Sequence, residues 1–536
     1  MKKQWIVLIA LASLTACSER IGSSSSPTSS PSVPFSSSAS ESSATVSSSV
    51  STSSTGTSSS LSATSSSVSN EVALPDSAEF TAFWDYSSSI SVSLKFSNAS
   101  LHDLSYYGAN DNQKWGDVYF PCTLTVKENG HETAFSEVGA RMKGNTSRRE
   151  IADASGNISQ SCHLKISLKA TFDDAMYDLT QFKAYKHDWS TDATGLSARK
   201  KRNLYGMEKF DLKYLPRNEG QTLSQEIYCY DAFRSAGFLA PHAKWASLTL
   251  SSDVVSKDFT YEIIEDVDKV FLKRHFSKAE AQGDLYKCVW GTDANGSWSG
   301  ANLARDGAVS KTTDSSGLTA GSRISKGRIG VEDNYAGYHP NYQLKTNDDG
   351  EASDFSKMAN YINGIWNVRY QKAPQNTLES LLDVQEFLKF EALSYLFGNF
   401  DDQRNNANNY FLYFRPSDGK AIYLPYDWDW AVGAKDSSKN LDLSTFTPLQ
   451  TTGLNGDITT NIYWVTFFQN SSLAYSQSSY IATYKESIRS YVAQGHLAQE
   501  RYSSLISHAP TSLGTSDLAV AQSYMSAKLK TISSSL

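Results

Sequence analysis

The chain has 536 residues, and 49 Lys and Arg against 56 Asp and Glu give a formal net charge of −7 and a sequence pI of about 5.8. An acidic chain of this kind lacks the basic surface of a nucleic-acid-binding protein, so we expect no nucleic acid partner. Hydrophobic residues make up 40% and aromatic residues 12%, which is enough for a sizeable core and excludes disorder along the whole chain.

The first residues have the charge and hydropathy pattern of a secretory signal peptide. Lys2 and Lys3 precede a short apolar run over residues 5–12, and small residues follow. The segment Leu14-Thr-Ala-Cys17 resembles the lipobox of bacterial lipoproteins, in which cleavage leaves a lipidated cysteine as the first residue. We therefore expect residues 1–17 to be a lipoprotein signal peptide, and Cys17 to anchor the protein by its lipid in the cell envelope, at the outer membrane or the cell surface.

Residues 18–71 are a Ser/Thr-rich stretch with almost no aromatic or charged residues. Such a composition cannot bury enough apolar surface to offset the entropy of ordering, so it predicts a disordered linker. The folded part is then expected to begin at residue 72 and to hang from its lipid on a flexible tether.

Four cysteines remain in the folded part: Cys122, Cys162, Cys229 and Cys288. In an oxidising compartment they permit two disulfides with three possible connectivities, and buried free thiols are the equal alternative. Their scattered positions do not have the spacing of zinc ligands.

The N-terminal half of the folded part is predicted to be rich in β structure. Hydrophobic residues alternate over residues 90–96 and 118–126, so residues 78–135 are interpreted as antiparallel strands. Another strand ends in a small polar loop that contains Arg141 and Gly144. The segment His163-Leu-Lys-Ile-Ser-Leu168 follows as a strand with Lys165 inside it.

Helical periodicity replaces alternation from Leu223 to Ala236, where Glu226, Tyr230 and Phe233 share one face. Gly237 stands where a left-handed C-cap is expected. Strands return over residues 246–250 and 259–264.

We divide the folded part into a β-rich unit, residues 72–265, and a more helical unit, residues 266–536. The second unit contains an irregular insertion at about 290–372 that is richest in Gly, Ser, Asn and Asp up to residue 350. Insertions of this length are uncommon in compact domains and are often functional.

An apolar helical stripe in this half predicts a helix that starts at a capping-box variant, Asp383-Val-Gln-Glu386, and ends at Gly398. A polar loop follows over residues 399–409, and then a β-hairpin over residues 410–424. The segment Tyr426-Asp-Trp-Asp-Trp430 comes next, and the tail from residue 479 is predicted to be helical.

This loop and this segment are rich in oxygen ligands. The loop contains Asp401, Asp402, Asn406 and Asn409, and the segment after the hairpin contains Asp427 and Asp429. In an extended segment residues two apart share a face, so we expect both of the later carboxylates to point the same way. Carboxylate and amide oxygens are the ligands that Mg²⁺ and Mn²⁺ prefer, so Asp427, Asp429, Asn406 and Asn409 are candidate metal ligands.

A helix, an acidic loop, a β-hairpin and a further carboxylate follow each other in the order in which a protein kinase presents its catalytic residues. In this reading Asp401 or Asp402 orients the acceptor hydroxyl. Upstream, the loop around Gly144 covers phosphates, the strand lysine Lys165 neutralises them, and Glu226 on the helix holds that lysine.

Several sequence blocks resemble the CotH kinase family, named for spore coat protein H. These blocks run in family order through residues 75–435. They are Val138-Gly-Ala-Arg-Met-Lys-Gly-Asn-Thr-Ser147, Leu204-Tyr-Gly-Met-Glu-Lys-Phe-Asp-Leu-Lys213, Ser224–Gly237, Tyr261–Asp268, Gly283-Asp-Leu-Tyr-Lys287 and Gly398–Gly433. The resemblance implies an α+β, atypical two-lobed protein-kinase-like fold with a β-rich N-lobe and a helical C-lobe. It further implies an enzyme that binds ATP with Mg²⁺ or Mn²⁺ and phosphorylates Ser or Thr of a protein substrate.

Carried over to this chain, the resemblance makes Lys165 the nucleotide-contacting lysine, Glu226 its partner, Asp401 the catalytic aspartate and Asp427 the metal-binding aspartate. Arg141 and Gly144 are expected beside the nucleotide. The loop is longer than is common in the family, which leaves Asp402 as the alternative to Asp401 and leaves Asn406 and Asn409 as alternative metal ligands. The segment around Lys165 lacks the paired lysines common in the family, which makes Lys169 a lesser candidate.

Two other classes of function compete with the kinase. A surface-tethered binding or adhesion module would use the stalk, the insertion and the many Trp and Tyr residues to hold a glycan or a protein. A glycoside hydrolase would use Asp427 with Asp429 or Asp401 as paired carboxylates, but acid and base normally lie on opposite sides of a cleft.

Overall fold

The computed structural model describes residues 72–109, 119–144, 147–170, 193–214, 222–292, 298–303, 324–325, 341–347, 355–434, 442–450, 473–510 and 516–536. These residues fall in one compact unit that extends from Val68 to Leu536. The predicted signal peptide with Cys17, the predicted linker and much of the predicted insertion lie outside the described residues. Helices and strands both contribute, so the α+β class is confirmed; the division into two lobes stays a prediction.

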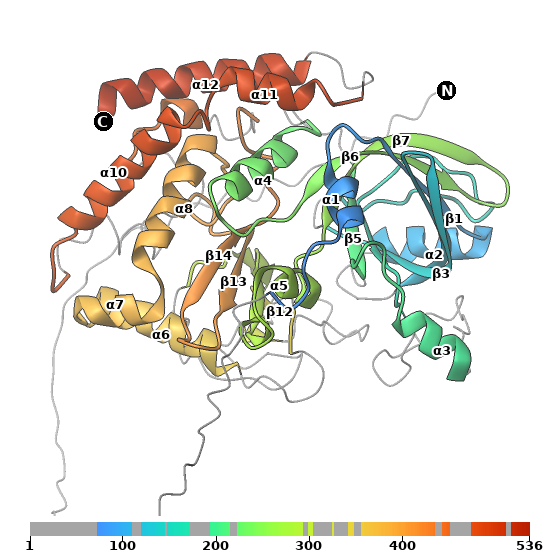
Figure 1. The fold of residues 1–536 in the computed structure, drawn as a ribbon, viewed down its shortest axis with the longest axis horizontal. Coiled ribbons are helices and arrows are strands. Elements are labelled where there is room, and N and C mark those ends of the chain that lie inside the picture. Colours follow the sequence, from blue (N-terminus) through green and yellow to red (C-terminus); the bar gives the residue numbers. More distant parts are fainter. Residues whose placement is uncertain are drawn as a thin grey trace, which may run out of the picture. The chain divides into compact units, whose positions relative to one another are not determined.

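The N-terminal part of the unit is a closed barrel of seven strands in the order β1-β2-β3-β4-β5-β7-β6 (Figure 1). Every neighbouring pair is antiparallel except β1 with β6, which is parallel and closes the barrel. The strands are β1 (Ile90–Lys95), β2 (Phe120–Glu128), β3 (His131–Met142), β4 (Leu164–Ser167), β5 (Lys209–Lys213), β6 (Ala243–Ser251) and β7 (Ser256–Glu265).

Alternating apolar side chains fill the barrel, as the sequence pattern predicts. Along β2 every second residue is buried, and Leu124 and Val126 belong to the same apolar cluster as Val92 and Leu94 of β1. The expectation of strands alone over residues 78–135 is wrong, because α1 (Ala78–Trp84) and α2 (Asn98–Ala109) also occur there. Helix α2 packs against β2 and β3.

Local signals explain these two helices. The Ser77 side chain accepts a hydrogen bond from the Phe80 N–H and so caps the start of α1. In α2 the buried Leu101 and Leu104 are spaced by three residues, which is helical and not strand spacing.

Helix α4 (Gln225–Ser235) lies between the barrel strands β5 and β6 in the chain and packs against β6. It confirms the predicted helix, and Gly237 has the positive φ of 89° that its C-terminal turn requires. Helix α3 (Ala193–Lys200) precedes β5.

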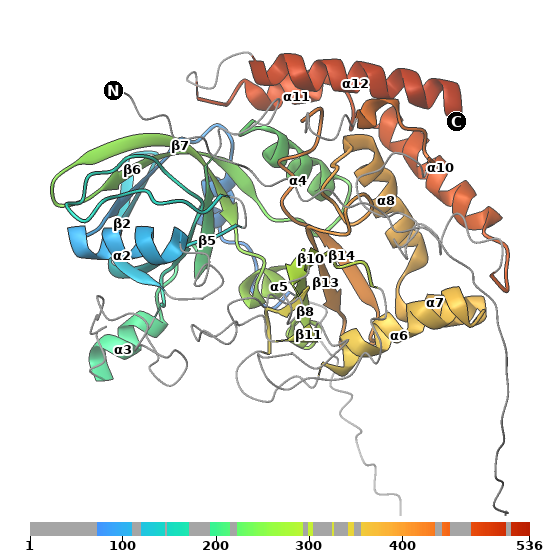
Figure 2. The same cartoon turned by 180° about the vertical axis from the view of Figure 1, so that it is seen from behind.

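The second half holds a five-stranded sheet of order β11-β12-β8-β13-β14 and several helices (Figure 2). Its sheet strands are β8 (Leu285–Cys288), β11 (Ile324–Ser325), β12 (Tyr342–Leu344), β13 (Tyr410–Phe414) and β14 (Ala421–Pro425), and β9 (Gly291–Thr292) pairs with β10 (Trp298–Ser299). The helical elements are α5 (Lys269–His275), η2 (Glu280–Gln282), α6 (Ser356–Tyr370), α7 (Gln375–Leu381), α8 (Val384–Phe397), η4 (Leu443–Thr445), α10 (Ser478–Ala493), α11 (Gln499–Ile506) and α12 (Ser516–Ser535).

Helix α8 is the predicted helix with its predicted ends. The Asp383 side chain accepts a hydrogen bond from the Glu386 N–H, and Gly398 takes a left-handed conformation at the other end. Helices α8 and α10 lie side by side. The hairpin β13-β14 confirms the predicted β segments.

Helix α12 packs against the chain at two places, just before the polar loop over residues 399–409 and just after residue 430. The Tyr524 hydroxyl donates to the Leu396 carbonyl at 3.0 Å, and a Cβ on Gly398 would lie 2.1 Å from that hydroxyl. A Cβ on Gly433 would lie 2.9 Å from the Tyr524 Cβ. Both glycines therefore allow α12 to approach the chain just before residue 399 and just after residue 430.

The four cysteines between residues 122 and 288 are buried and free. The alternative of free thiols is therefore the one that the structure shows. Within the described ranges, no helix has the length and apolar character needed to cross a bilayer.

Candidate active site

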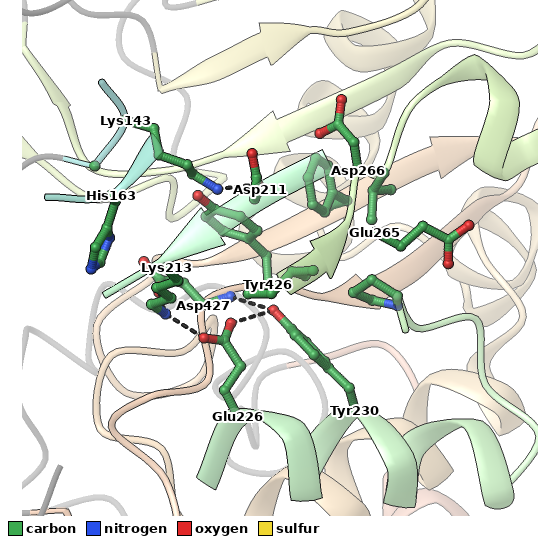
Figure 3. A pocket seen from close by; sticks show the side chains of 15 residues that line it. Lys143, His163, Asp211, Lys213, Glu226, Tyr230, Glu265, Asp266, Tyr426 and Asp427 are labelled. Carbon is green, nitrogen blue, oxygen red and sulfur yellow. Dashed lines mark hydrogen bonds and ion pairs between the residues drawn. The ribbon is translucent and has the colours of Figure 1, made fainter. Parts of the chain in front are cut away.

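A cleft lies where the barrel strands meet α4 and the β13-β14 hairpin. Its walls come from the loop after β3, the ends of β5 and β7, helix α4, β13 and the chain after β14 (Figure 3). Charged residues dominate these walls, among them Lys143, Lys213, Glu226 and Asp427.

Lys213 is the centre of the acidic end of this cleft. Its ammonium forms ion pairs with Glu226 and Asp427 and lies 3.3 Å from the carboxylate of Asp429. Burial alone would lower the pKa of Lys213, but these three carboxylates raise it well above its usual value. Lys213 therefore stays charged.

Glu226 connects this lysine to the segment after β14. One carboxylate oxygen binds Lys213, and the other accepts hydrogen bonds from the Tyr230 hydroxyl at 2.6 Å and from the Trp428 N–H at 3.2 Å. Tyr230, one turn further along α4, accepts a hydrogen bond from the Asp427 N–H at 2.9 Å (Figure 3). Glu226 and Tyr230 lie on one face of α4, as predicted, and the hydrogen bonds that they accept fix the backbone of the Asp427 segment.

Asp427 does not lie on an extended strand, and that expectation is wrong. Its φ is 57°, in the left-handed region, because the hydrogen bonds from its own N–H and from Trp428 turn the chain toward α4. The two carboxylates still converge, since Asp427 and Asp429 both reach Lys213. A left-handed backbone at a non-glycine residue is uncommon and is often found at functional sites.

Asp401 is the focus of the loop after α8. Its carboxylate accepts hydrogen bonds from the side-chain amides of Asn406, Asn408 and Asn409, at 2.5 to 3.1 Å. Burial and the nearby charge of Asp427 together raise its pKa to about 6 despite these bonds. Asp401 and Asp427 therefore lie in one electrostatic environment.

Asp402 points into the protein and has a different role. It is fully buried, and one oxygen accepts hydrogen bonds from the N–H groups of Arg404 and Asn405. Burial raises its pKa to about 7. The structure thus separates the two adjacent aspartates, and Asp402 organises the turn of the loop.

The pairing of Lys165 with Glu226 is wrong. Lys165, on β4, binds Asp266 at 2.5 Å and lies 4.0 Å from Asp211, whereas Lys213 on β5 occupies the place beside Glu226. The register explains the difference, because Lys165 faces Asp211, two residues before Lys213 on the neighbouring strand.

Sequence reasoning missed Lys213, although it ends the block Leu204–Lys213. The available signal was chain order: Lys213 belongs to the strand that immediately precedes the helix of Glu226. The lesser candidate Lys169 binds Glu208 and not Glu226.

Of the two other residues predicted to contact the nucleotide, one lines the cleft and the other does not. Gly144 lines the cleft with a φ of 90°, and a Cβ there would lie 2.1 Å from the Ser147 hydroxyl. Arg141 lies 5.5 Å from the ring centre of Tyr119 and is not among the residues that line the cleft.

In their present arrangement, the candidate metal ligands provide only part of a site for a divalent cation. Among the described residues, no three or more His, Cys, Asp or Glu side chains form a ready metal site; the Lys213 ammonium already lies among the carboxylates. The Asp427 side chain is 34% exposed. Asn406 and Asn409 point amide nitrogens at Asp401, and their amide oxygens accept no hydrogen bond from the described part of the chain. Asp427 and these amides offer the hard oxygen donors that Mg²⁺ prefers.

The CotH kinase protein family model matches residues 177–516, which is more than half of the chain. The protein therefore belongs to the CotH kinase family. The matched segment includes Lys213, Glu226, Asp401 and Asp427. It begins after Lys165, so the first part of the resemblance, from residue 75, lies outside it.

One solved structure that matches is the crystal structure of a Helicobacter pylori proinflammatory kinase, CtkA. The match covers 61% of this chain and 92% of that chain, at 11% sequence identity and a TM-score of 0.26. A score this low does not establish a shared fold. No curated protein matches the sequence.

Proposed function

We propose that the protein is a protein kinase that transfers the γ-phosphate of ATP to Ser or Thr of a protein substrate, with Mg²⁺ or Mn²⁺. The observation that carries the proposal is the buried Lys213 ammonium, held by Glu226 of α4 and Asp427 at the wall of an open cleft. A lysine held by a helical glutamate beside a metal-binding aspartate is the arrangement that phosphoryl transfer requires.

In this proposal each residue has a definite task. Lys213 donates hydrogen bonds to the phosphates, and the loop at Gly144 covers them. Asp401 accepts the proton of the acceptor hydroxyl, for which a pKa of about 6 is suited near neutral pH. Asp427, with Asn406 or Asn409, would hold the divalent cation, which neutralises phosphate charge when bound.

The finer predictions from the sequence extend this proposal. Residues 72–265, which hold the barrel and α1 to α4, would be the N-lobe, and residues 266–536, which hold the five-stranded sheet and the later helices, would be the C-lobe, with the cleft between them. Lipid on Cys17 and the linker over residues 18–71 would place the kinase in the cell envelope, where its acceptor would be a surface or secreted protein.

The alternative is a surface-tethered binding module that keeps the fold and does not transfer phosphate. One observation favours it: the Lys213 ammonium occupies the centre of the carboxylates where a cation would bind. The kinase requires a cation to share Asp427 with Lys213, whereas the binding module does not.

The decisive experiment compares the protein with its Asp427→Ala variant in the presence of labelled ATP and Mg²⁺ or Mn²⁺. Transferred phosphate is counted on the protein itself and on casein. Asp258→Ala is the matched control, because Asp258 is an exposed aspartate of the β6-β7 hairpin. We expect label with the unchanged protein and with Asp258→Ala, and none with Asp427→Ala.

Equal label with Asp427→Ala would exclude the proposed role of Asp427. No label with any of the three proteins, together with no rise in melting temperature on adding ATP and metal, would favour the binding module. Glycans and surface proteins would then be the ligands to screen.

A further inference from the structure

A group of lysines surrounds Tyr426, the residue that precedes Asp427. The Lys143 and Lys287 ammonium groups lie 5.5 Å and 4.1 Å from the centre of the Tyr426 ring. Lys143 and Tyr426 line the cleft described above, so this group borders the same cleft as Lys213. We call Lys143, Lys287 and Tyr426 the basic cluster.

Lys287 is the unusual member of the basic cluster. It lies on β8, half-buried, and its ammonium donates a hydrogen bond to the Tyr426 hydroxyl at 2.8 Å. Among the residues that the structure describes, no carboxylate forms an ion pair with it. Burial and the nearby charges of Lys143, Lys345 and Lys165 lower its pKa well below the usual value, against a smaller raising effect of Asp211.

The nearby carboxylates are already engaged with other lysines. Asp211 forms its ion pair with Lys143, and Asp266 binds Lys165 at 2.5 Å. Both carboxylates thus form ion pairs with other lysines of the described chain, and the positive charge of Lys287 is compensated only through the field of Asp211. A half-buried ammonium without a counter-charge is unfavourable by itself, and it becomes favourable when an anion binds beside it.

The neighbouring acidic end has the opposite balance. Lys213 is surrounded by Glu226, Asp427 and Asp429, and Glu262 lies on the facing residue of β7. In the absence of metal these carboxylates repel an anion. A free anion that enters the cleft without metal is therefore directed to the basic cluster.

We propose that the basic cluster is a binding subsite for a phosphate-type anion, held by the ammonium groups of Lys287 and Lys143. The tetrahedral oxygens of such a group accept hydrogen bonds from both ammonium groups at once. The subsite does not require phosphoryl transfer, so it holds whether or not the protein is a kinase. The anion is a phosphate group of a nucleotide or of a phosphorylated protein segment.

Calorimetric titration with inorganic tripolyphosphate, without metal and at low salt, tests the subsite on the whole protein. We expect Lys287→Met to weaken binding by about 10-fold or more, because a hydrogen bond to a charged group is lost. Lys287→Arg should retain binding. Lys257→Met is the matched control, since Lys257 is an exposed lysine of the β6-β7 hairpin, and it should leave the affinity unchanged.

Equal affinity of the unchanged protein and of folded Lys287→Met would overturn the proposal. If circular dichroism shows that Lys287→Met does not fold, Lys143→Met is the second variant, with the same expected loss and the same overturning result. Loss with Lys257→Met to the same degree would show general charge attraction and would also overturn it.

Competition identifies the source of the anion. Displacement of tripolyphosphate by ATP and not by a phosphoserine peptide supports a nucleotide phosphate, and the reverse result supports a phosphorylated protein segment. Asp427→Ala removes a carboxylate that repels the anion, so it should abolish phosphate transfer without weakening metal-free tripolyphosphate binding. Failure of the kinase proposal is therefore distinguishable from failure of the subsite.

Discussion

Lys213, which lines the cleft, and Lys287, which contacts the cleft residue Tyr426, lie in opposite electrostatic surroundings. Lys213 shares its charge with three carboxylates, which raise its pKa well above the usual value. Lys287 has a tyrosine hydroxyl and other lysines as neighbours, and burial with these charges lowers its pKa well below that value.

The difference shows that residue type and burial do not by themselves decide what a lysine does. Lys213 compensates buried carboxylates, so the native fold depends on its charge. Lys287 forms no ion pair with a carboxylate of the described chain, so its ammonium form becomes more favourable when an anion binds beside it. Each of the following changes tests this contrast.

Replacing Lys213 should have the largest effect. Lys213→Met leaves Glu226, Asp427 and Asp429 without their shared cation, so we expect the free energy of unfolding to fall by about 3–5 kcal/mol. Urea unfolding followed by circular dichroism at neutral pH measures the change. A loss below about 1 kcal/mol would contradict the central role of this ion pair.

The adjacent aspartates Asp401 and Asp402 offer the same contrast among carboxylates. If the protein is a kinase, Asp401→Asn should lower kcat by about 100-fold or more, because the base is removed. Asp402→Asn keeps an oxygen that accepts from the Arg404 and Asn405 N–H groups and should retain most of the activity. Labelled phosphate transfer measures both, and an inactive, folded Asp402→Asn beside an active Asp401→Asn would reverse the assignment.

Lys244, on β6 of the barrel, is a further lysine whose surroundings lower its pKa. It is buried, donates to the carbonyls of Phe83 and Asp85, and burial lowers its pKa from 10.5 to about 8. Between these two pH values the unfolded chain holds a proton that the folded protein has lost, so stability should rise with pH across this window. Denaturant midpoints from neutral pH upward should show this rise, and a rise of equal size in Lys244→Met would exclude Lys244 as its cause.

Replacing Lys287 should have the smallest effect on stability. Lys287→Met removes a half-buried charge that has no carboxylate partner, so the free energy of unfolding should change by less than about 1 kcal/mol or increase. Urea unfolding beside Lys213→Met gives the direct comparison. A loss as large as that of Lys213→Met would show that Lys287 is a structural residue.

Much of the fold could be predicted because its signals are local. The Asp383 cap and the glycine at residue 398 define α8, and Gly237 ends α4 where expected. Helix α2 was missed because the predicted alternation of the flanking strands was extended across it, although its own leucines have helical spacing.

The candidate site was predicted where sequence neighbours act together. Asp401 with its asparagines lies in one loop, and Asp427 with Asp429 in one segment, so proximity in the chain implies proximity in space. The conformation of that segment could not be predicted, because a hydrogen bond from the Asp427 N–H to the distant Tyr230 hydroxyl imposes it.

The sequence by itself determined the family resemblance, the α+β class, and Glu226, Asp401 and Asp427 as candidate site residues. Only the tertiary structure decided which lysine reaches Glu226, because β4 and β5 both carry lysines and their register places Lys213 beside α4 and Lys165 beside Asp266. It also decided that, among the described residues, the carboxylates near Lys287 form their ion pairs with other lysines. Ion pairs join residues that are far apart in the chain, and the sequence does not contain the register and packing that bring them together.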